Sequence, residues 1–325
     1  MVKIGIIGAG GWGTSLSIIL SEKHKVYLWE KFPDYAEILV KKRENTYFLP
    51  GFKIPEEIEI TSDLSEVLSF ASYIIIAVPS QYFRSVVKEI KNYYKNQPIL
   101  IATKGLEETG LKMSDVFKEI LPHACVSILS GPTIGREVAE KKPTAAVVAS
   151  DNINTAKKFQ KILSSKTFRI YTTNDITGVE LAGLSKNVIA IGAGIVEGLG
   201  LGINTKSAYL ARGIEEIKRL GAALGGKEKT FWGLAGLGDL ITTSFSPYSR
   251  NRSYGEALAK NKSEEFLKNT KMVVEGIRVT KILKQLGEKN NIELPIISSI
   301  YRIIYKKTDP WKEIKKLMTR KLKNE

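Results

Sequence analysis

The chain has 325 residues, of which 43% are hydrophobic and 26% are charged, and its formal net charge at pH 7 is +15. This length is enough for about two domains. The single Cys125 excludes an internal disulfide framework and an all-cysteine metal site, and we expect no metal ion. A strand-like run begins almost at Met1, which leaves no room for a signal peptide, and no apolar run reaches the roughly 18 residues of a membrane helix. We therefore expect a cytoplasmic protein without an integral membrane segment.

The positive charge favours an anionic partner, which could be nucleic acid, an anionic membrane or a small anionic substrate. Lysines and glutamates are interspersed along most of the chain, as on a solvated surface, and we interpret the basic tail at residues 315–325 as a solvated helix end. The chain has no basic patch interleaved with aromatic residues and no zinc-finger or RNA-binding signature, so we expect no nucleic-acid partner.

Short β-rich runs alternate with helical stretches in the first half of the chain. The strands are expected at residues 2–7, 26–29, 73–78, 99–102, 126–129 and 144–148, with helices at 14–21, 81–93, 113–121 and 154–163. This alternation predicts an α/β domain with a parallel, doubly wound sheet. After about Gly178 only helical periodicity remains. We expect a dinucleotide-binding domain of the Rossmann type at residues 1–178 and an all-helical substrate-binding domain at 179–325. The turn-rich segment 43–55 is interpreted as a loop that forms a cover or a contact.

The stretch GIIGAGGWGTSL follows the first strand and opens a helix, and it contains Gly8, Gly10 and Gly13 in G-x-G-x-x-G spacing. Gly8 permits the tight turn, Gly10 lets the backbone approach a pyrophosphate, and Gly13 allows close packing of helix on strand. The pyrophosphate would bind at the N-terminus of that helix. A purely structural glycine turn is the alternative, but the strand and helix on either side favour a dinucleotide, NAD or NADP.

Glu30 lies 22 positions after Gly8, where an acidic residue binds the ribose hydroxyls of NAD. Lys31 follows and could instead contact a 2′-phosphate, so NAD is only slightly favoured over NADP. A surface pair between Glu30 and Lys31 is a further interpretation.

Three motifs follow strands of the predicted sheet: AVPS at residues 77–80, ATKG with Lys104, and SGPT at residues 130–133. Ligands of open parallel sheets bind at the carboxyl ends of the strands. Each motif by itself could be an ordinary turn between a strand and a helix, but three at one sheet edge indicate a ligand site.

Lys186 interrupts an apolar helical stretch, and lysine is almost never fully buried without a partner. A snorkelling lysine is the structural interpretation. The two histidines, His24 and His123, are interpreted as surface residues, which leaves Lys186 as the candidate proton carrier. Base chemistry by lysine requires a pKa nearer neutrality, which burial and a second cation produce, and Lys104 is the candidate for that cation.

Two further motifs in the helical half carry polar groups. Asp239 follows three closely spaced glycines and could be a ligand-binding residue or a helix N-cap. Ser249, Arg250 and Asn251 supply a hydroxyl, a guanidinium and an amide, a combination suited to a phosphate ester, although a solvated basic loop is the alternative.

Taken together, these segments resemble the bacterial-type NAD(P)-dependent glycerol-3-phosphate dehydrogenase family over nearly the whole chain. The matching segments, in order, are GAGGWGT, NTYFLPG, AVPSQ, ATKGLE, SGPTIGREVA, ELAGLSKNVIAIGAGIVEGLGLGINT, GLAGLGDLITT, SRNRSYG, VVEG and ELPI. The resemblance implies reversible hydride transfer between NAD(P)H and dihydroxyacetone phosphate, which gives sn-glycerol 3-phosphate for glycerophospholipids. It also implies an active site between a Rossmann domain and a helical domain.

The resemblance assigns a role to individual residues. Lys186 matches the general acid/base. Positions of the substrate site are matched by Lys104, Gly131, Thr133, Lys186, Asp239, Ser249, Arg250 and Asn251. Positions of the cofactor site are matched by Gly8, Gly10, Gly11, Trp12, Gly13, Glu30, Lys31, Lys104, Gly135, Arg250, Val273 and Glu275. In the mechanism that follows, Lys186 exchanges a proton with the C2 oxygen of the substrate. The substrate phosphate is held by Arg250, Asn251 and Ser249. Asp239 contacts a substrate hydroxyl or orients Lys186.

Four positions depart from the family pattern. Gly11 stands where serine is common, Ser185 replaces an apolar residue, and Glu30 with Lys31 replaces a more basic pair. One alternative function is a related two-domain dehydrogenase that acts on a hydroxy acid or sugar acid through a catalytic lysine. Another is a non-catalytic NAD-sensing or nucleic-acid-binding protein. The candidate assembly is a homodimer.

Overall fold

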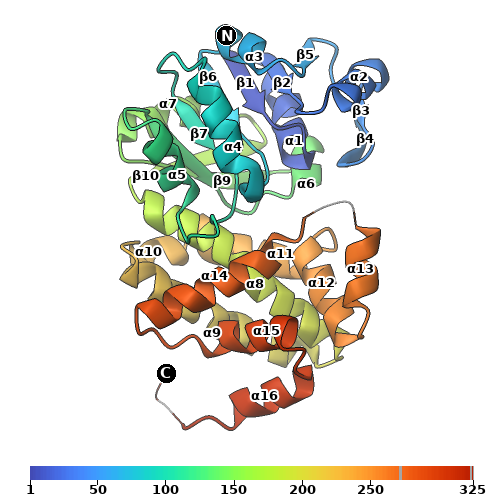
Figure 1. The fold of residues 1–325 in the computed structure, drawn as a ribbon, viewed down its shortest axis with the longest axis vertical. Coiled ribbons are helices and arrows are strands. Elements are labelled where there is room, and N and C mark those ends of the chain that lie inside the picture. The colour runs from blue at the N-terminus through green and yellow to red at the C-terminus, as the bar shows by residue number, and fades with distance from the viewer. Residues whose placement is uncertain (271–272, 323, 325) are drawn as a thin grey trace. The chain divides into compact units, whose positions relative to one another are not determined.

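The computed structural model describes residues 1–270, 273–322 and 324, and its elements are shown in Figure 1. Contacts divide the chain into two compact units. The first unit consists of Met1–Glu107 and Leu111–Glu180, and the second consists of Glu108–Gly110 and Leu181–Glu325. The domain boundary between residues 178 and 179 that we expected stays a prediction.

The first unit carries ten strands and seven helices. Its strands are β1 (Lys3–Ile7), β2 (Lys25–Trp29), β3 (Glu44–Asn45), β4 (Leu49–Lys53), β5 (Ile58–Thr61), β6 (Tyr73–Ile76), β7 (Ile99–Ile101), β8 (Val126–Ser130), β9 (Thr144–Ser150) and β10 (Phe168–Thr173). Its helices are α1 (Gly11–Ser21), α2 (Pro33–Lys42), α3 (Leu64–Phe70), α4 (Ser80–Lys91), α5 (Met113–Ile120), α6 (Gly135–Ala139) and α7 (Ile153–Leu163). Each strand and helix expected from the sequence is present, with ends that differ by a few residues.

Eight strands form one sheet in the order β10-β9-β8-β7-β6-β1-β2-β5. The sheet is doubly wound around β1, which pairs in parallel with both β2 and β6, and this confirms the predicted fold class. One expectation was wrong: β9 pairs antiparallel with β8, so β9 and β10 run against the other six strands. Apolar periodicity places a residue on a face of the sheet but does not encode the direction of the strand.

The two edge strands, β5 and β10, were not predicted. Only Ile58 of β5 and, in β10, Phe168 and Ile170 are buried, so neither strand contains the continuous apolar run that marks the central strands. By contrast, β1 is buried at four of its five positions. Apolar side chains from this sheet and its helices form the core of the first unit.

The segment 43–55 is more ordered than a loop, because β3 and β4 pair as a small antiparallel ribbon. Asn45 is fully buried and anchors this ribbon to the first turn of α1. Its Nδ2 donates to the carbonyl of Ala9 and to the hydroxyl of Thr14, both at 2.8 Å. Its Oδ1 accepts from the Tyr35 hydroxyl at 2.6 Å. The ribbon is therefore held against the glycine-rich turn by one amide side chain.

Helices are the only regular secondary structure in the described part of the chain after Thr173. They are α8 (Ile176–Gly198), α9 (Gly202–Ala223), α10 (Glu228–Phe231), a π-helical turn (Leu234–Gly238), α11 (Asp239–Phe245), α12 (Arg250–Ala259), α13 (Ser263–Asn269), α14 (Glu275–Lys289), α15 (Pro295–Tyr305) and α16 (Pro310–Met318). The predicted switch to an all-helical second half is confirmed for these residues.

Helix α8 corrects the expectation about apolar segments. It has 23 residues with a mean hydropathy of 1.5 in its most apolar window, so length and composition alone would allow it to cross a membrane. Every residue of that window is buried inside the fold. A helix that is apolar on all sides is typical of the centre of a large helical core as well as of a membrane.

Two buried glutamates hold helix N-termini. Glu180 accepts the backbone N–H of Ser114 at 3.0 Å at the start of α5. Glu216, on α9, accepts the backbone N–H groups of Ile296 and Ile297 at 2.7 and 3.1 Å at the start of α15. Burial raises the pKa of each carboxyl to about 7, although these hydrogen bonds act in the opposite direction. Both helices are thus capped by a side chain distant in sequence.

Candidate active site

The turn between β1 and α1 has the shape of a phosphate cradle. Gly8 has φ +112, a conformation that side chains rarely adopt. A Cβ at Gly13 would lie 1.9 Å from the carbonyl oxygen of Gly8, so this position accepts only glycine. A Cβ at Gly10, by contrast, would meet nothing within 4 Å, so the backbone there faces open space. Gly10 is the N-cap of α1 and supplies no side-chain acceptor, which suits an external phosphate.

The absence of a side chain at Gly11 is explained by the local packing. A Cβ there would lie 2.6 Å from the backbone oxygen of Phe48, in the segment that connects β3 and β4. Gly135, at the start of α6, is similarly confined, because its Cβ would lie 2.9 Å from Ser15 Oγ on α1. Trp12 is partly buried and packs against the core of the first unit. The contacts of Gly11, Trp12 and Gly135 with a cofactor stay predictions.

The pair at the end of β2 is arranged differently from a surface ion pair. The Glu30 side chain is buried and accepts the backbone N–H of Phe32 at 3.2 Å, and burial raises its pKa. Lys31 instead pairs with Glu89 on α4, with Nζ–Oε1 at 2.7 Å. The interpretation as a pair between Glu30 and Lys31 was therefore wrong, because the two side chains take separate partners.

Lys104, Gly131 and Thr133 lie together after β7 and β8. The Lys104 ammonium donates to the Gly131 carbonyl at 3.1 Å, and the Thr133 hydroxyl donates to the same oxygen at 3.1 Å. Gly131 has φ +142, and a Cβ there would lie 2.9 Å from Ala146 Cα on β9. The ATKG and SGPT motifs therefore meet at one carbonyl, as their positions at strand ends indicated. The idea that Lys104 is a second cation beside Lys186 stays a prediction.

Lys186 is buried within α8, with 8% of its surface exposed. Its Nζ lies 2.6 Å from Asp239 Oδ1 and 2.6 Å from the Thr243 hydroxyl, both on α11. The side chain does not snorkel to solvent, so that interpretation was wrong. A lysine nitrogen held by two fixed partners is preorganised to deliver a proton as the ammonium and to accept one as the neutral amine.

Asp239 is not a helix cap. It is the first residue of α11, whose N-cap is Gly238, and its side chain is 1% exposed. The interpretation as an N-cap was wrong because the carboxylate is used by Lys186 instead. The π-helical turn before Asp239 sets its position. Such turns are often found at functional sites.

Asn251 lies beside the residue that follows Lys186. Its Nδ2 donates to Asn187 Oδ1 at 3.0 Å, and its Oδ1 accepts the backbone N–H of Gly276 at 2.9 Å. Arg250 is exposed, and its Nη1 donates to the carbonyl of Val273 at 2.9 Å. Val273, just before α14, and Gly276, in its first turn, are thus held to the SRN motif, and Glu275 lies between them in the chain. The sequence motif VVEG gave no sign of this on its own.

Helices α8 and α12 pack backbone against backbone. A Cβ at Gly194 would lie 1.9 Å from the carbonyl oxygen of Arg252, and one at Gly255 would lie 1.9 Å from that of Ile191. Only glycine allows helices this close. Because α12 begins at Arg250, this crossing brings the phosphate-binding candidates to the same helix that carries Lys186.

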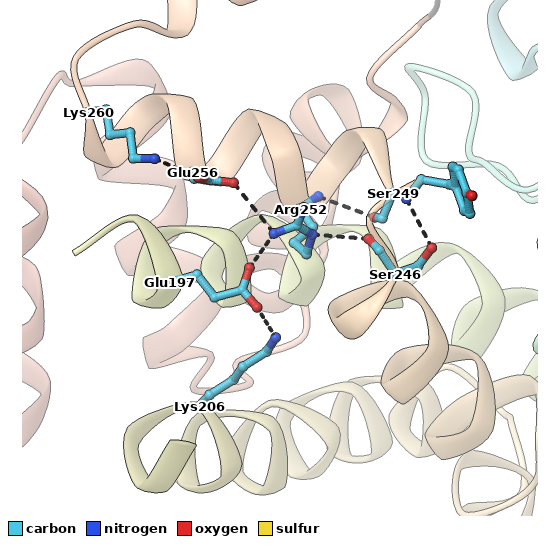
Figure 2. Close-up of polar contacts among 8 residues, drawn as sticks. Glu197, Lys206, Ser246, Ser249, Arg252, Glu256 and Lys260 are labelled. Carbon is cyan, nitrogen blue, oxygen red and sulfur yellow. Dashed lines mark hydrogen bonds and ion pairs between the residues drawn. The ribbon is translucent and has the colours of Figure 1, made fainter. Parts of the chain in front are cut away.

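A network of charges fixes the turn before α12 (Figure 2). Ser249 is the N-cap of α12, and its hydroxyl accepts the backbone N–H of Arg252 at 3.3 Å. The Arg252 side chain donates from Nε to the carbonyl of Ser246 at 3.0 Å and pairs through Nη1 with Glu197 on α8. Glu197 also pairs with the buried Lys206 of α9. Burial opposes ionisation of Glu197, but these two cations outweigh it and lower its pKa.

Sequence reasoning missed Asn45, Asn187, Thr243 and the pair of Glu197 and Arg252. Asn187 directly follows Lys186, and Thr243 lies one helical turn after Asp239, so adjacency was the available signal. Asn45 lies inside the NTYFLPG motif but had no assigned role. Among residues 1–270, 273–322 and 324, no group of three or more His, Cys, Asp or Glu residues could hold a metal ion.

The two histidines lie outside this set of residues. His123 is exposed, whereas His24 is half-buried with Nε2 3.1 Å from the carbonyl of Ile162, and burial lowers its pKa.

A doubly wound sheet with a glycine cradle and a helical unit with a buried, preorganised lysine define a nicotinamide-dependent dehydrogenase.

Comparison with known proteins agrees with this class. Residues 3–156 match the N-terminal family of NAD-dependent glycerol-3-phosphate dehydrogenase, and residues 175–315 match the C-terminal family. The chain is 44% identical to a glycerol-3-phosphate dehydrogenase (NAD(P)+) of Carboxydothermus hydrogenoformans, over 100% of this chain and 98% of the relative. A second such enzyme, of Syntrophotalea carbinolica, is 43% identical over 100% of this chain and 99% of its own.

A solved structure is also similar. The crystal structure of glycerol-3-phosphate dehydrogenase from Coxiella burnetii superposes with a TM-score of 0.95 at 35% identity, and the match covers 98% of this chain and 99% of that one. The chain belongs to the NAD(P)-dependent glycerol-3-phosphate dehydrogenase family.

Proposed function

We propose that this chain transfers hydride reversibly between NAD(P)H and dihydroxyacetone phosphate, which gives sn-glycerol 3-phosphate for glycerophospholipid synthesis. The observation that carries the proposal is the buried Lys186, fixed by Asp239 and Thr243 at 2.6 Å each on the helix that α12 crosses. Membership of the family supports the reaction and the use of NAD or NADP.

Lys186 is the general acid/base of this reaction. When bound, the nicotinamide cofactor supplies or accepts the hydride. In reduction, the Lys186 ammonium donates a hydrogen bond and then a proton to the C2 oxygen as negative charge develops on it, and in oxidation the neutral amine takes the proton of the C2 hydroxyl. Asp239 and Thr243 hold Nζ in place during both steps, so no reorganisation is needed when the proton moves.

The substrate phosphate binds at the start of α12. Arg250 supplies a guanidinium, Asn251 an amide and Ser249 a hydroxyl, and the charge-assisted bonds from Arg250 are the strongest of these. Binding at this remote group fixes C2 for reaction and so contributes to kcat as well as to affinity. Lys104, Gly131 and Thr133, which meet at the Gly131 carbonyl, are further substrate-binding residues in this proposal.

The cofactor occupies the glycine cradle. Gly8, Gly10 and Gly13 hold the pyrophosphate at the N-terminus of α1, and Gly10 leaves the space that it needs. The remaining contacts of this proposal come from Gly11, Trp12, Glu30, Lys31, Lys104, Gly135, Arg250, Val273 and Glu275.

NAD is the preferred cofactor in this proposal. Glu30 is buried at the end of β2 and would accept from the ribose hydroxyls, while a carboxylate there repels a 2′-phosphate. Lys31, which could attract that phosphate, is paired with Glu89. We expect Glu30→Gln to raise the ratio of kcat/KM for NADPH to that for NADH, and no change in this ratio would contradict the role of Glu30.

We also place the protein in the cytoplasm and propose that it is a homodimer. The proposed use of a nicotinamide cofactor and a phosphorylated substrate supports this location. Light scattering of the purified chain measures the mass directly, and a monomeric mass would contradict the dimer.

The test of the reaction is the oxidation of NADH and of NADPH, followed by absorbance, with dihydroxyacetone phosphate as the substrate. A panel of 2- and 3-hydroxy acids and sugar acids separates this function from that of a related two-domain dehydrogenase. Turnover of such an acid without turnover of dihydroxyacetone phosphate would overturn the proposal. Arg250→Ala should raise KM for dihydroxyacetone phosphate far more than KM for unphosphorylated dihydroxyacetone.

A further inference from the structure

Helix α16 is attached to the second unit by its acidic side chains. Glu313 is buried and pairs with Arg302 of α15, with Nε–Oε1 at 2.9 Å. Asp309 caps α16 by accepting the backbone N–H of Lys312 at 2.9 Å. Residues 302–322 carry eight basic and two acidic side chains, and both acidic ones are engaged in these internal contacts. Glu264 and Glu293 from other segments pair with Lys307 and Arg320, so four of the eight positive charges remain in excess and the region is cationic.

Apolar side chains lie in this cationic region. Trp311 is 52% exposed and Met318 is 79% exposed, and a separation of seven residues places both on one side of the helix. Leu322, four residues beyond, is 95% exposed. Large apolar side chains this exposed are costly to leave in water and often mark an interaction surface.

Three lysines accompany these apolar residues. Lys312, Lys315 and Lys316 are exposed and line an open hollow of about 530 Å³ together with Thr308 and Thr319, next to the ion pair of Arg302 and Glu313. Ammonium and hydroxyl groups are suitable donors for phosphate oxygens. The hollow therefore fits an anionic phosphate group, and the apolar residues beside it fit the acyl region of a lipid layer.

We propose that α16 is a peripheral docking helix for an anionic phospholipid bilayer. Lys312, Lys315 and Lys316 contact the lipid phosphates, while Trp311 and Met318 enter the interfacial region. A helix with lysines flanking exposed Trp and other apolar residues, lying flat at the interface, is typical of such binding. This inference does not depend on the reaction that the protein catalyses, because it concerns a surface that can be tested without substrate or cofactor.

Two other occupants fit the surface less well. A nucleic acid would use the lysines but would leave Met318 and Leu322 in water. A second copy of this chain on a two-fold axis would bring this lysine-rich face against itself, and like charges facing one another are unfavourable. The observations thus favour a partner that is anionic and apolar at once.

The experiment is flotation of the full chain with vesicles of phosphatidylglycerol and phosphatidylcholine, compared with pure phosphatidylcholine. We expect binding to the anionic vesicles that weakens as salt is raised. The triple variant Lys312→Gln, Lys315→Gln, Lys316→Gln should lower the vesicle affinity about 100-fold, since each lysine near an anionic surface contributes about a factor of five. Met318→Ser should also lower it.

Matched controls come from other helices. The triple variant Lys157→Gln, Lys158→Gln, Lys161→Gln removes the same charge from exposed positions on α7. Ile203→Ser, on α9, changes an apolar side chain with the same 79% exposure as Met318. Both controls should bind the vesicles as the unchanged chain does, apart from a small loss from the lower net charge.

Three results would overturn the proposal. The first is an equal loss of vesicle affinity in the α7 and α16 triple variants, which would indicate a general effect of net charge. The second is binding of duplex DNA that depends on the α16 lysines while anionic vesicles do not float the chain. The third is dissociation of an oligomer by Met318→Ser, measured by light scattering without vesicles, which would identify the face as an interface between copies.

Discussion

The ammonium of Lys186 lies 2.6 Å from Asp239 Oδ1, and both side chains are almost completely removed from solvent. A buried ion pair of this kind is weak evidence for stability, because desolvation of both charges offsets their attraction. Its position on α8 and α11, next to Thr243, instead indicates that the pair serves to hold one nitrogen atom in place.

Replacement of Lys186 by methionine should lower kcat by about 10²–10⁴-fold, the usual contribution of a general acid/base. The affinity for NADH, measured by fluorescence, should remain within a few-fold because the cradle lies in the other unit. Arg302→Met is the control, since it also leaves a buried carboxylate, Glu313, without its partner and lies outside the network of Figure 2. Equal losses of kcat in the two variants would show that a disturbed buried charge, and not proton transfer, explains the effect.

Arg252 is expected to act as a positioning residue for the phosphate site. Arg252→Met removes the bonds to Ser246 and Glu197 that fix the turn before α12, and KM for dihydroxyacetone phosphate should rise about tenfold, as for the loss of one or two hydrogen bonds. The KM for unphosphorylated dihydroxyacetone should change little.

The control for this variant lies at the outer edge of the same network (Figure 2). Lys260→Met breaks the exposed pair of Lys260 with Glu256, and exposed pairs contribute little. If Lys260→Met and Arg252→Met raised KM equally, the network would have no specific role in holding Ser249 to Asn251.

Asn45 does not contact the cofactor in our proposal. We still expect it to affect cofactor affinity, because it holds the ribbon of β3 and β4 against the glycine-rich turn. Asn45→Ala leaves the carbonyl of Ala9 without this donor at the glycine turn, and an unmet buried group costs about 1–3 kcal/mol. We expect a lower free energy of unfolding and a Kd for NADH that rises about tenfold, both measurable by fluorescence. Asn152→Ala, which removes the N-cap of α7, should lower stability while leaving the Kd unchanged. An unchanged Kd in Asn45→Ala would exclude the link between ribbon and cradle.

The stabilisation that Glu216 and Glu180 contribute should fall as pH rises from about 4.5 to about 7. Burial raises the pKa of Glu216 from 4.5 to about 7, so the folded chain binds this proton more tightly than the unfolded chain does. The stabilisation from this protonation is complete below about pH 4.5 and is lost as pH rises through about 7, and Glu180 acts in the same direction.

Melting temperatures measured across this pH range check the prediction. Glu216→Gln should reduce the fall in melting temperature, because the amide cannot ionise. Glu288→Gln, at an exposed carboxylate on α14 paired with Lys284, should leave the pH dependence as it is. A pH dependence that Glu216→Gln leaves intact would show that this carboxyl is not the group that titrates.

The amino-acid sequence by itself determined the features that depend on neighbouring residues in the chain. Apolar runs of four to six residues specified the central strands, and the spacing of Gly8, Gly10 and Gly13 specified the turn after the first of them, because these depend on near neighbours in the chain. Likewise, the matching segments around Lys186 and Ser249 to Asn251 indicated the family, and the comparisons confirm it.

Tertiary structure decided the features that depend on residues far apart in sequence. The reversed direction of β9 and the edge strands β5 and β10 follow from pairing across the sheet, which apolar periodicity does not encode. The partners of Lys186 and Lys31 are 53 and 58 residues away, so no local pattern specified them. The sequence therefore indicated which side chains carry the chemistry, whereas the partner of each charged group was decided by how the helices and strands pack.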